Sequence, residues 1–207
     1  YLNTRKGHAM PRNGFFGVKN SHIAVLKDED VFTYETPVKI PGTVEIKMEP
    51  SVETSTSYGD NDPWLDKNQD NGGSGTISFY DTESTAEMRK LFAEIIGFDI
   101  DAKGRVLGTA GKTPKKFAFM CEQPGHIISK RRCFLECQLK APSMDAKTLE
   151  DKPDITQLDY DLTWRPVTLP TGWRGSFYDT YSDIEDYDTF FSKVDTQLTP
   201  APASEVA

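Results

Sequence analysis

Residues 108–113, Gly-Thr-Ala-Gly-Lys-Thr, are the segment of this sequence closest to a nucleotide-binding motif. A phosphate-binding loop needs a further glycine five positions before its Gly-Lys pair, and Val106 stands there. The loop must also open a helix whose N-terminus faces the phosphate. Here Pro114 precedes an alternating run that begins at Phe117. The segment therefore does not predict nucleotide binding.

Three cysteines and one histidine suggest a zinc site: Cys121, His126, Cys133 and Cys137. Zinc takes four convergent ligands, commonly from tight Cys-x-x-Cys pairs. Cys133 and Cys137 instead have the spacing of buried positions on one strand, and cysteine is often buried. We therefore expect no metal and no other cofactor. The odd cysteine count without dense spacing argues against a disulfide scaffold and indicates synthesis in a reducing cytoplasm.

Acid–base catalysis has few residues to use. Nucleophilic catalysis needs a positioned base, usually histidine, and only His8, His22 and His126 are present, without a nucleophile-elbow motif. His22 alternates within an expected strand, where a structural role accounts for it. Asp159 and Asp161 resemble a hydrolytic carboxylate pair, but they stand two apart on the wet face of one strand. The sequence predicts no catalytic residue and a protein that is not an enzyme.

The elements that position these residues are mostly strands. Apolar and charged residues alternate over 44–49, which is the period of a half-buried strand. Residues 158–165 alternate in the same way, with leucine and aromatic residues between the polar ones. Further strands are expected over 15–26, 76–81, 117–121 and 133–139. In the last of these we expect one shared face: Cys133, Leu135, Cys137 and Leu139.

One helix is predicted. Ser84 stands three residues before Glu87, which is a capping box, and Gly97 stands where a helix stop is expected. Between them, apolar residues recur at three- and four-residue spacing: Met88, Leu91, Phe92, Ile95 and Ile96. Many strands and one helix predict a mainly β fold, an antiparallel β-sandwich or open barrel with one flanking α-helix.

Residues 50–75 are rich in Ser, Thr, Asn, Asp and Gly and are predicted to be a long loop. Pure linkers avoid large apolar residues, so we expect this loop to order against a partner; the alternative is a loop folded on its own surface. A short helix with its aromatic residues inward is expected over 188–194. The candidate subunit-interface residues lie in the loop and the C-terminal segment: Tyr58, Trp64, Leu65, Trp173, Phe190 and Phe191.

A chain of 207 residues suits one domain. We expect the domain to span residues 10–196, with the long loop at 50–75 and a C-terminal segment at 166–196. Residues 1–9 precede the first methionine, Met10, and are interpreted as a cloning remnant or a flexible arm. Residues 197–207 are expected to form a disordered tail.

The net charge of −8 and the pI near 5.0 are the opposite of what a DNA-gripping protein needs. The basic run 130–132 is interpreted as a solvated turn. No stretch of about twenty apolar residues occurs, so no membrane contact is expected, and no signal-peptide pattern opens the chain.

Residues 16–20 (FGVKN) and 34–42 (YETPVKIPG) resemble the opening of the major tail tube proteins of long-tailed bacteriophages with non-contractile tails. The order of the later segments is also similar: a polar element at 58–61, a Gly-rich return at 71–76, the capped helix, and the strand at 115–120. Residues 187–194 are similar to the family's ending, with Phe190-Phe191 in place of Trp-Phe.

The resemblance implies a structural virion protein that closes into hexameric rings. The rings stack into a tail tube, the conduit for genomic DNA during ejection into the host. The implied partners are other copies of the chain and further tail proteins, namely the tape measure, the tail terminator and the distal tail protein, while DNA passes without tight binding. The implied location is the virion tail, assembled in the cytoplasm of the bacterial host. The family has no catalytic residues to transfer.

A tube wall that lets DNA slide must not hold it through basic residues. The candidates for lining the lumen are therefore the wet faces of the two best strands: Glu45, Lys47, Glu49, Asp159 and Asp161. A period of two does not decide whether this face points inward or outward. The alternative function is a head–tail connector or a receptor-binding β-sandwich module of finite oligomeric state.

Overall fold

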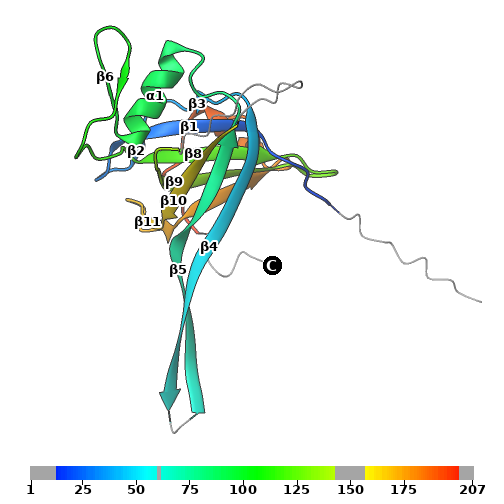
Figure 1. The fold of residues 1–207 in the computed structure, drawn as a ribbon. Coiled ribbons are helices and arrows are strands. Elements are labelled where there is room, and N and C mark those ends of the chain that lie inside the picture. The colour runs from blue at the N-terminus through cyan, green and yellow to red at the C-terminus, as the bar shows by residue number, and fades with distance from the viewer. Residues whose placement is uncertain (1–12, 60–61, 143–156, 201–207) are drawn as a thin grey trace, which may run out of the picture.

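The structure is a computed structural model that describes residues 13–59, 62–142 and 157–200, with the backbone alone for residues 54–69. Residues 1–9, interpreted above as a remnant or an arm, and residues 201–207 of the expected tail lie outside the described residues. The part described is mainly β, with one large antiparallel sheet and one short α-helix (Figure 1). The fold class predicted from the sequence is confirmed.

The large sheet has the strand order β2-β1-β8-β9-β10-β5-β4, with β3 added to β1 and β13 added to β9. Its strands are β1 (Lys19–Asp28), β2 (Thr33–Tyr34), β3 (Val38–Lys39), β4 (Thr43–Gly59), β5 (Asp62–Phe79), β8 (Phe117–Gln123), β9 (Lys130–Leu139), β10 (Leu158–Arg165) and β13 (Phe177–Tyr181). Two small hairpins pair β6 (Asp99–Ile100) with β7 (Val106–Leu107) and β11 (Val167–Thr168) with β12 (Arg174–Gly175).

Strand β9 is the point at which the sheet divides. Its first half pairs with β13 and its second half with β10, while β8 lies along the other edge. The branch β10-β5-β4 therefore leaves the rest of the sheet at an angle, and in Figure 1 β4 and β5 run down the view while β1 and β8 run across it. The sheet curls into an open barrel around one apolar interior.

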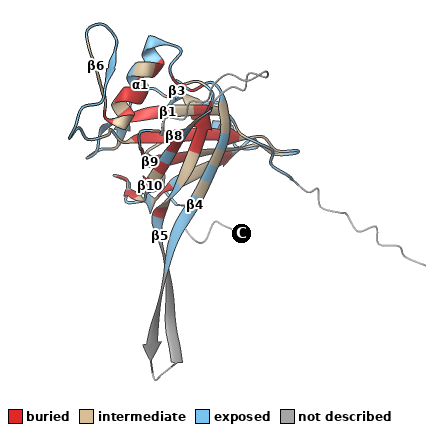
Figure 2. Cartoon of the chain, in the orientation of Figure 1, coloured by how far each residue is buried: buried red, intermediate tan, exposed pale blue. Residues whose placement is uncertain are grey.

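The first core fills that interior. It gathers Ile23, Phe117, Phe119, Tyr160 and Trp164 from three strands of the curled sheet with the apolar stripe of the helix. Buried residues concentrate where these strands cross (Figure 2). Helix α1 (Ala86–Ile96) buries residues of the predicted stripe, Met88, Leu91, Phe92 and Ile95, with Ile96 packed at the margin.

The helix begins and ends nearly where the sequence predicts. Its N-cap is Thr85, whose hydroxyl accepts from the Met88 amide at 3.1 Å, so the cap lies one residue beyond the predicted Ser84. Gly97 ends the helix in the left-handed region, at φ 89°, where a side chain would be strained.

A second core lies on the opposite face of β1, β8 and β9. Ala24, Ala118, Met120, Cys133 and Leu135 are covered there by the C-terminal segment. The covering residues come from β11 onward and include Val167, Leu169, Trp173, Tyr178, Phe190, Phe191 and Leu198. The expected short helix at 188–194 is replaced by two 3₁₀ turns, η1 (Glu185–Tyr187) and η2 (Phe190–Ser192). Leu198 packs on this core, so the tail predicted from residue 197 begins against the body.

The prediction of one shared face in residues 133–139 is wrong. Cys133 and Leu135 face the second core, whereas Cys137 and Leu139 face the first. The pairing with β8 shifts between Phe117↔Cys137 and Phe119↔Phe134, which places one extra residue in β9. Such a β-bulge turns every later side chain to the opposite face of the sheet.

The long loop predicted at 50–75 is also wrong, because these residues continue β4 and β5. The two strands pair from Thr43↔Phe79 to Gly59↔Asp62 as one hairpin. The glycines that suggested a loop serve close packing instead. A Cβ on Gly73 would lie 2.3 Å from the Trp164 ring, and one on Gly75 would lie 2.0 Å from the Lys47 carbonyl oxygen.

Candidate functional site

The five residues predicted to line a lumen come together on one face of the sheet. Strand β5 lies between β4 and β10, so each row across the face takes one residue from each strand. The rows are Glu45–Ser78–Asp159, Lys47–Thr76–Asp161 and Glu49–Ser74–Thr163. Side chains alternate along a strand, so these residues share the face opposite the first core. We call this surface the polar face.

The polar face carries charge over a floor of small hydroxyl residues. Glu45, Lys47, Glu49, Asp159 and Asp161 are all exposed. The Ser78 hydroxyl donates to Asp159 at 2.5 Å, and Lys47 lies 3.8 Å from Glu45. A shallow hollow of about 300 Å³ follows the second and third rows and reaches Lys140. Four carboxylates against Lys47, Lys140 and the exposed Arg165 at the end of β10 leave the face with a small acidic excess.

Beyond the body, the β4–β5 hairpin continues as an arm, which we define as residues 52–59 and 62–70. Strand β10 pairs with β5 only as far as Trp164↔Gly73, and Pro166 follows. Among the described residues, those of the arm have ladder partners only within the hairpin. At about 3.3 Å per strand residue, the arm reaches roughly 25 Å past the last supporting strand. Figure 1 shows β4 and β5 running out of the body together.

The root of the arm is fixed to the body. The Asp70 carboxylate accepts from the Ser176 hydroxyl at 2.7 Å and from the Gly72 amide at 2.8 Å. Ser176 is buried beside β13, so this contact joins the arm to the C-terminal segment. The ladder and this anchor together set the direction in which the arm leaves the body.

Strand β4 also forms an open edge of the sheet. Within the part of the chain described, β4 pairs with β5 alone along its 17 residues. Pro50 interrupts the row of donors and Val52 is 60% exposed at the root of the arm. Such an edge presents unpaired backbone groups that another strand can join.

The predicted interface residues divide between two regions. Trp173 and Phe191 are half-buried in the second core and Phe190 is 7% exposed, so packing within the chain accounts for these three. Tyr58, Trp64 and Leu65 lie in the arm, where the backbone alone is described. The arm itself was missed by the sequence analysis, and the alternation of 44–49 continuing past Pro50 was too weak to signal it.

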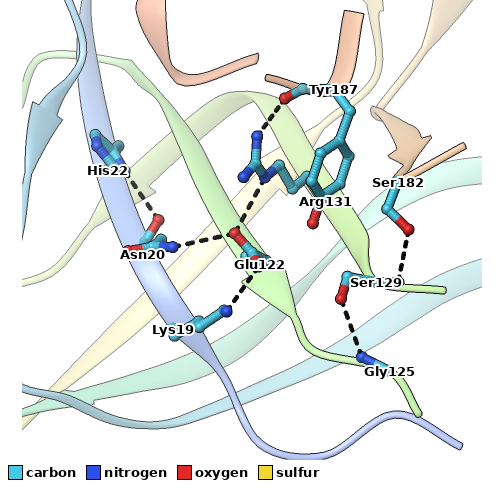
Figure 3. A network of polar contacts seen from close by, with 9 residues as sticks. All are labelled: Lys19, Asn20, His22, Glu122, Gly125, Ser129, Arg131, Ser182 and Tyr187. Carbon is cyan, nitrogen blue, oxygen red and sulfur yellow. Dashed lines mark hydrogen bonds and ion pairs between the residues drawn. The ribbon is translucent and has the colours of Figure 1, made fainter. Parts of the chain in front are cut away.

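A buried ion network holds the C-terminal segment on the sheet (Figure 3). The Glu122 carboxylate is 3% exposed and accepts from Lys19 at 3.0 Å, Asn20 at 3.0 Å and Arg131 at 3.1 Å. Burial raises the pKa of this carboxyl, but the three donors outweigh it and the net pKa is lowered. Arg131 also donates to the Tyr187 carbonyl and lies 3.7 Å from the Tyr187 ring centroid.

His22 belongs to the same network. Its ring stacks on Phe191 with centroids 4.3 Å apart, and its Nδ1 lies 2.8 Å from the Asn20 carbonyl oxygen. Burial lowers the pKa of this imidazole, against the raising effect of the Asn20 carbonyl. The neutral form is favoured, which fits the structural role predicted for His22.

The residues considered as zinc ligands or as a phosphate-binding loop do not form a site in the structure. Cys133 faces the second core while Cys121 and Cys137 face the first, so these three thiols do not converge. Residues 108–113 form an exposed connection between β7 and β8, and no helix follows them. Lys112 instead pairs with Asp99, whose other carboxylate oxygen accepts from Thr109 at 2.7 Å.

No family model matches this chain, and no curated protein does. Among solved structures, the chain is similar to a chain of the PVC sheath–tube complex of an extracellular contractile injection system, with 13% identity over 78% of this chain and 88% of that one and a TM-score of 0.42. The chain is also similar to the PVC sheath/tube terminator, with 14% identity over 80% of this chain and 96% of that one and a TM-score of 0.43. It is similar as well to the anti-feeding prophage tube-terminating cap, with 10% identity over 86% of this chain and 99% of that one and a TM-score of 0.42. Among the described residues, no helix has the length and apolar character to cross a membrane.

Proposed function

We propose that this chain is a structural subunit of a phage-type tail, in which hexameric rings stack into a tube and genomic DNA passes through it. The observation that carries the proposal is the arm. A two-stranded hairpin alone is at best marginally stable in water, so one that projects roughly 25 Å calls for support from another chain. The open edge of β4 next to it offers further backbone pairing.

We infer that the partner of the arm is an identical copy of this chain. An arm that binds a different surface on an identical copy makes a head-to-tail interface, which closes into a ring or continues as a filament. Stacked rings use both outcomes, one around the ring and one along the tube. The sequence resemblance to tail tube proteins supports the same arrangement, with the tape measure, terminator and distal tail proteins as further partners.

The polar face supports a conduit. In the proposed tube it lines the lumen, where its carboxylates repel the phosphates and its hydroxyl floor offers no fixed positive charge. DNA carries a charge about every 1.7 Å of helix axis, so a wall of this kind lets the polymer slide. No catalytic step is required of the subunit.

Sedimentation velocity and electron microscopy of the purified chain at rising concentration test this proposal. Rings or tubes with six subunits per ring are expected. The proposal is contradicted if the protein stays monomeric at high concentration and virions contain no tube made of this subunit. A closed oligomer that never extends supports the connector or receptor-binding alternative instead.

A further inference from the structure

A second hollow, of about 420 Å³, opens at the mouth of the barrel between β4 and the β8–β9 hairpin. Its apolar lining includes Phe134 of the first core and three residues at the margin of that core, Val18, Ile46 and Met48. We call it the mouth pocket. Glu45, at the end of the polar face, also lines this pocket, so the two surfaces meet at that residue, whose carboxylate lies 3.8 Å from Lys47.

On the β8–β9 side, opposite Glu45, the rim of the mouth pocket is aromatic and basic. Lys130 lies 5.0 Å from the Phe15 ring centroid and the Arg132 guanidinium 3.9 Å from that of Phe177. Phe15 is 44% exposed and Phe177 is 37% exposed. Exposed aromatic residues with arginine around a hollow are the composition of a binding hot spot.

The two cations of the rim differ in their pairing. Arg132 makes two 2.6 Å hydrogen bonds to Asp179, which neutralise it. Within the described part of the chain, Lys130 has an aromatic ring beside it and no carboxylate within ion-pairing distance. A partner that brings an acidic group beside an apolar one therefore matches this rim.

We propose that the mouth pocket receives the arm of a second copy of this chain. The inference rests on the proposed function and adds the receiving surface. The end of the arm, residues 58–66, has the sequence Tyr-Gly-Asp-Asn-Asp-Pro-Trp-Leu-Asp, which combines large apolar residues with Asp60, Asp62 and Asp66. This acidic and apolar composition complements a basic, aromatic rim around an apolar hollow.

The arm that fills the pocket must belong to another copy. Residues 44–48 of β4 form one wall of the pocket, and the same strand runs on from there into the arm. The end of the arm lies roughly 25 Å beyond the last supporting strand in a continuous ladder, so it cannot fold back to its own root. Pocket and arm are different surfaces of one chain, which gives a head-to-tail contact.

Charge reversal tests the contact. Lys130→Glu should raise the critical concentration for assembly about tenfold, because a close charge pair becomes a repulsion. Lys130→Met keeps the alkyl stem over Phe15 and should have a smaller effect, and Lys103→Glu in the exposed β6–β7 turn is the matched control. Adding Asp62→Lys and Asp66→Lys to Lys130→Glu should bring the critical concentration most of the way back to the wild-type value. Assembly of Lys130→Glu at the wild-type concentration, or no recovery in the charge-swapped chain, overturns the proposal.

Cross-linking separates this inference from the proposed function. Lys67→Cys in the arm with Gln123→Cys at the pocket rim should give a ladder of covalent oligomers when assembled protein is oxidised. Each single variant is the control, since the three native thiols are buried and burial raises their pKa, that of Cys121 to about 12. Assembled tubes without a ladder overturn the pocket contact and leave the tube standing. A chain that never assembles overturns both, and a lipid-like anion released from the purified protein overturns the pocket contact.

Discussion

The arm and the C-terminal segment contain similar residues and have opposite surroundings. Both combine aromatic residues with many Asp, Ser and Thr and little regular patterning. The C-terminal segment lies on the outer face of β8 and β9, where Phe190 is buried in the second core. The arm leaves the sheet where β10 ends and has ladder partners only within its own hairpin, as far as the structure describes them.

This difference separates a structural role from an assembly role. Aromatic residues become interface anchors only when the chain offers them no face of its own to cover. Strands β8 and β9 are buried on both faces, so the sheet needs a cover and the C-terminal segment supplies it. Among the described residues the arm has no such face beneath it, and in the proposed assembly its partner comes from another chain.

The largest expected effect is on the stability of the C-terminal cover. Phe190→Ala should lower the free energy of unfolding by about 3 kcal/mol, because it removes a buried ring that packs on Tyr178 and Phe191. Phe177→Ala, at a ring 37% exposed, is the matched control and should lose less than half as much. Urea unfolding of the two variants measures the difference. Equal losses would mean that the second core does not depend on this segment.

The Glu122 network gives the next largest effect, and it depends on pH. Glu122→Gln should cost about 2 kcal/mol at pH 7, because three donors lose a buried charged acceptor. The pKa of Glu122 is lowered in the folded chain from its ordinary 4.5. Its stabilisation is therefore present above pH 4.5 and is lost as the pH falls through the folded value.

Unfolding curves of wild type and Glu122→Gln, recorded from about pH 3 to about pH 7 at constant ionic strength, measure this dependence. The two chains should differ most at neutral pH and converge in acid. A gap that stays constant across the series would show that the ionised carboxylate is not what holds the C-terminal segment.

Sequence patterns predicted the elements that have one buried face and one solvent-exposed face. Residues 44–49 and 158–165 alternate, and the structure places them on either side of β5 in one branch of the sheet, with their polar residues in shared rows. The helix followed from its stripe and from Gly97 for the same reason. In each case a local period reports directly on burial.

The misses have physical causes that a local pattern does not contain. Gly73 and Gly75 look like loop residues, yet each makes room for a neighbour that only the tertiary structure brings close. The bulge in β9 places Cys133 and Leu135 on the opposite face from Cys137 and Leu139, and the apolar Phe134 is the only local sign of it in the sequence. The arm was missed because its polar composition resembles a loop, while its pairing comes from the register set in the body.

The polar face gives a smaller effect on the subunit. Replacing Glu45, Glu49, Asp159 and Asp161 by Lys should change the free energy of unfolding by less than about 1 kcal/mol, since exposed charges contribute little. In an assembled tail the same change should slow DNA ejection, more at low salt, where charges are screened less. Ejection rates that do not change at any salt concentration would show that these four residues do not line the path of the DNA.

The central claim is that the arm assembles the chain and does not fold it, and one variant tests this most directly. Residues 53–69 are replaced by Asn-Gly, a two-residue turn that closes a hairpin at the Val52↔Asp70 pair and keeps the Asp70–Ser176 anchor. The same samples are followed by urea unfolding and by sedimentation at rising concentration. The account predicts a free energy of unfolding within about 1 kcal/mol of wild type, because the excised part has no core beneath it, together with a protein that stays monomeric where wild type forms rings and tubes. A variant that still builds tubes, or one that no longer folds, would contradict it.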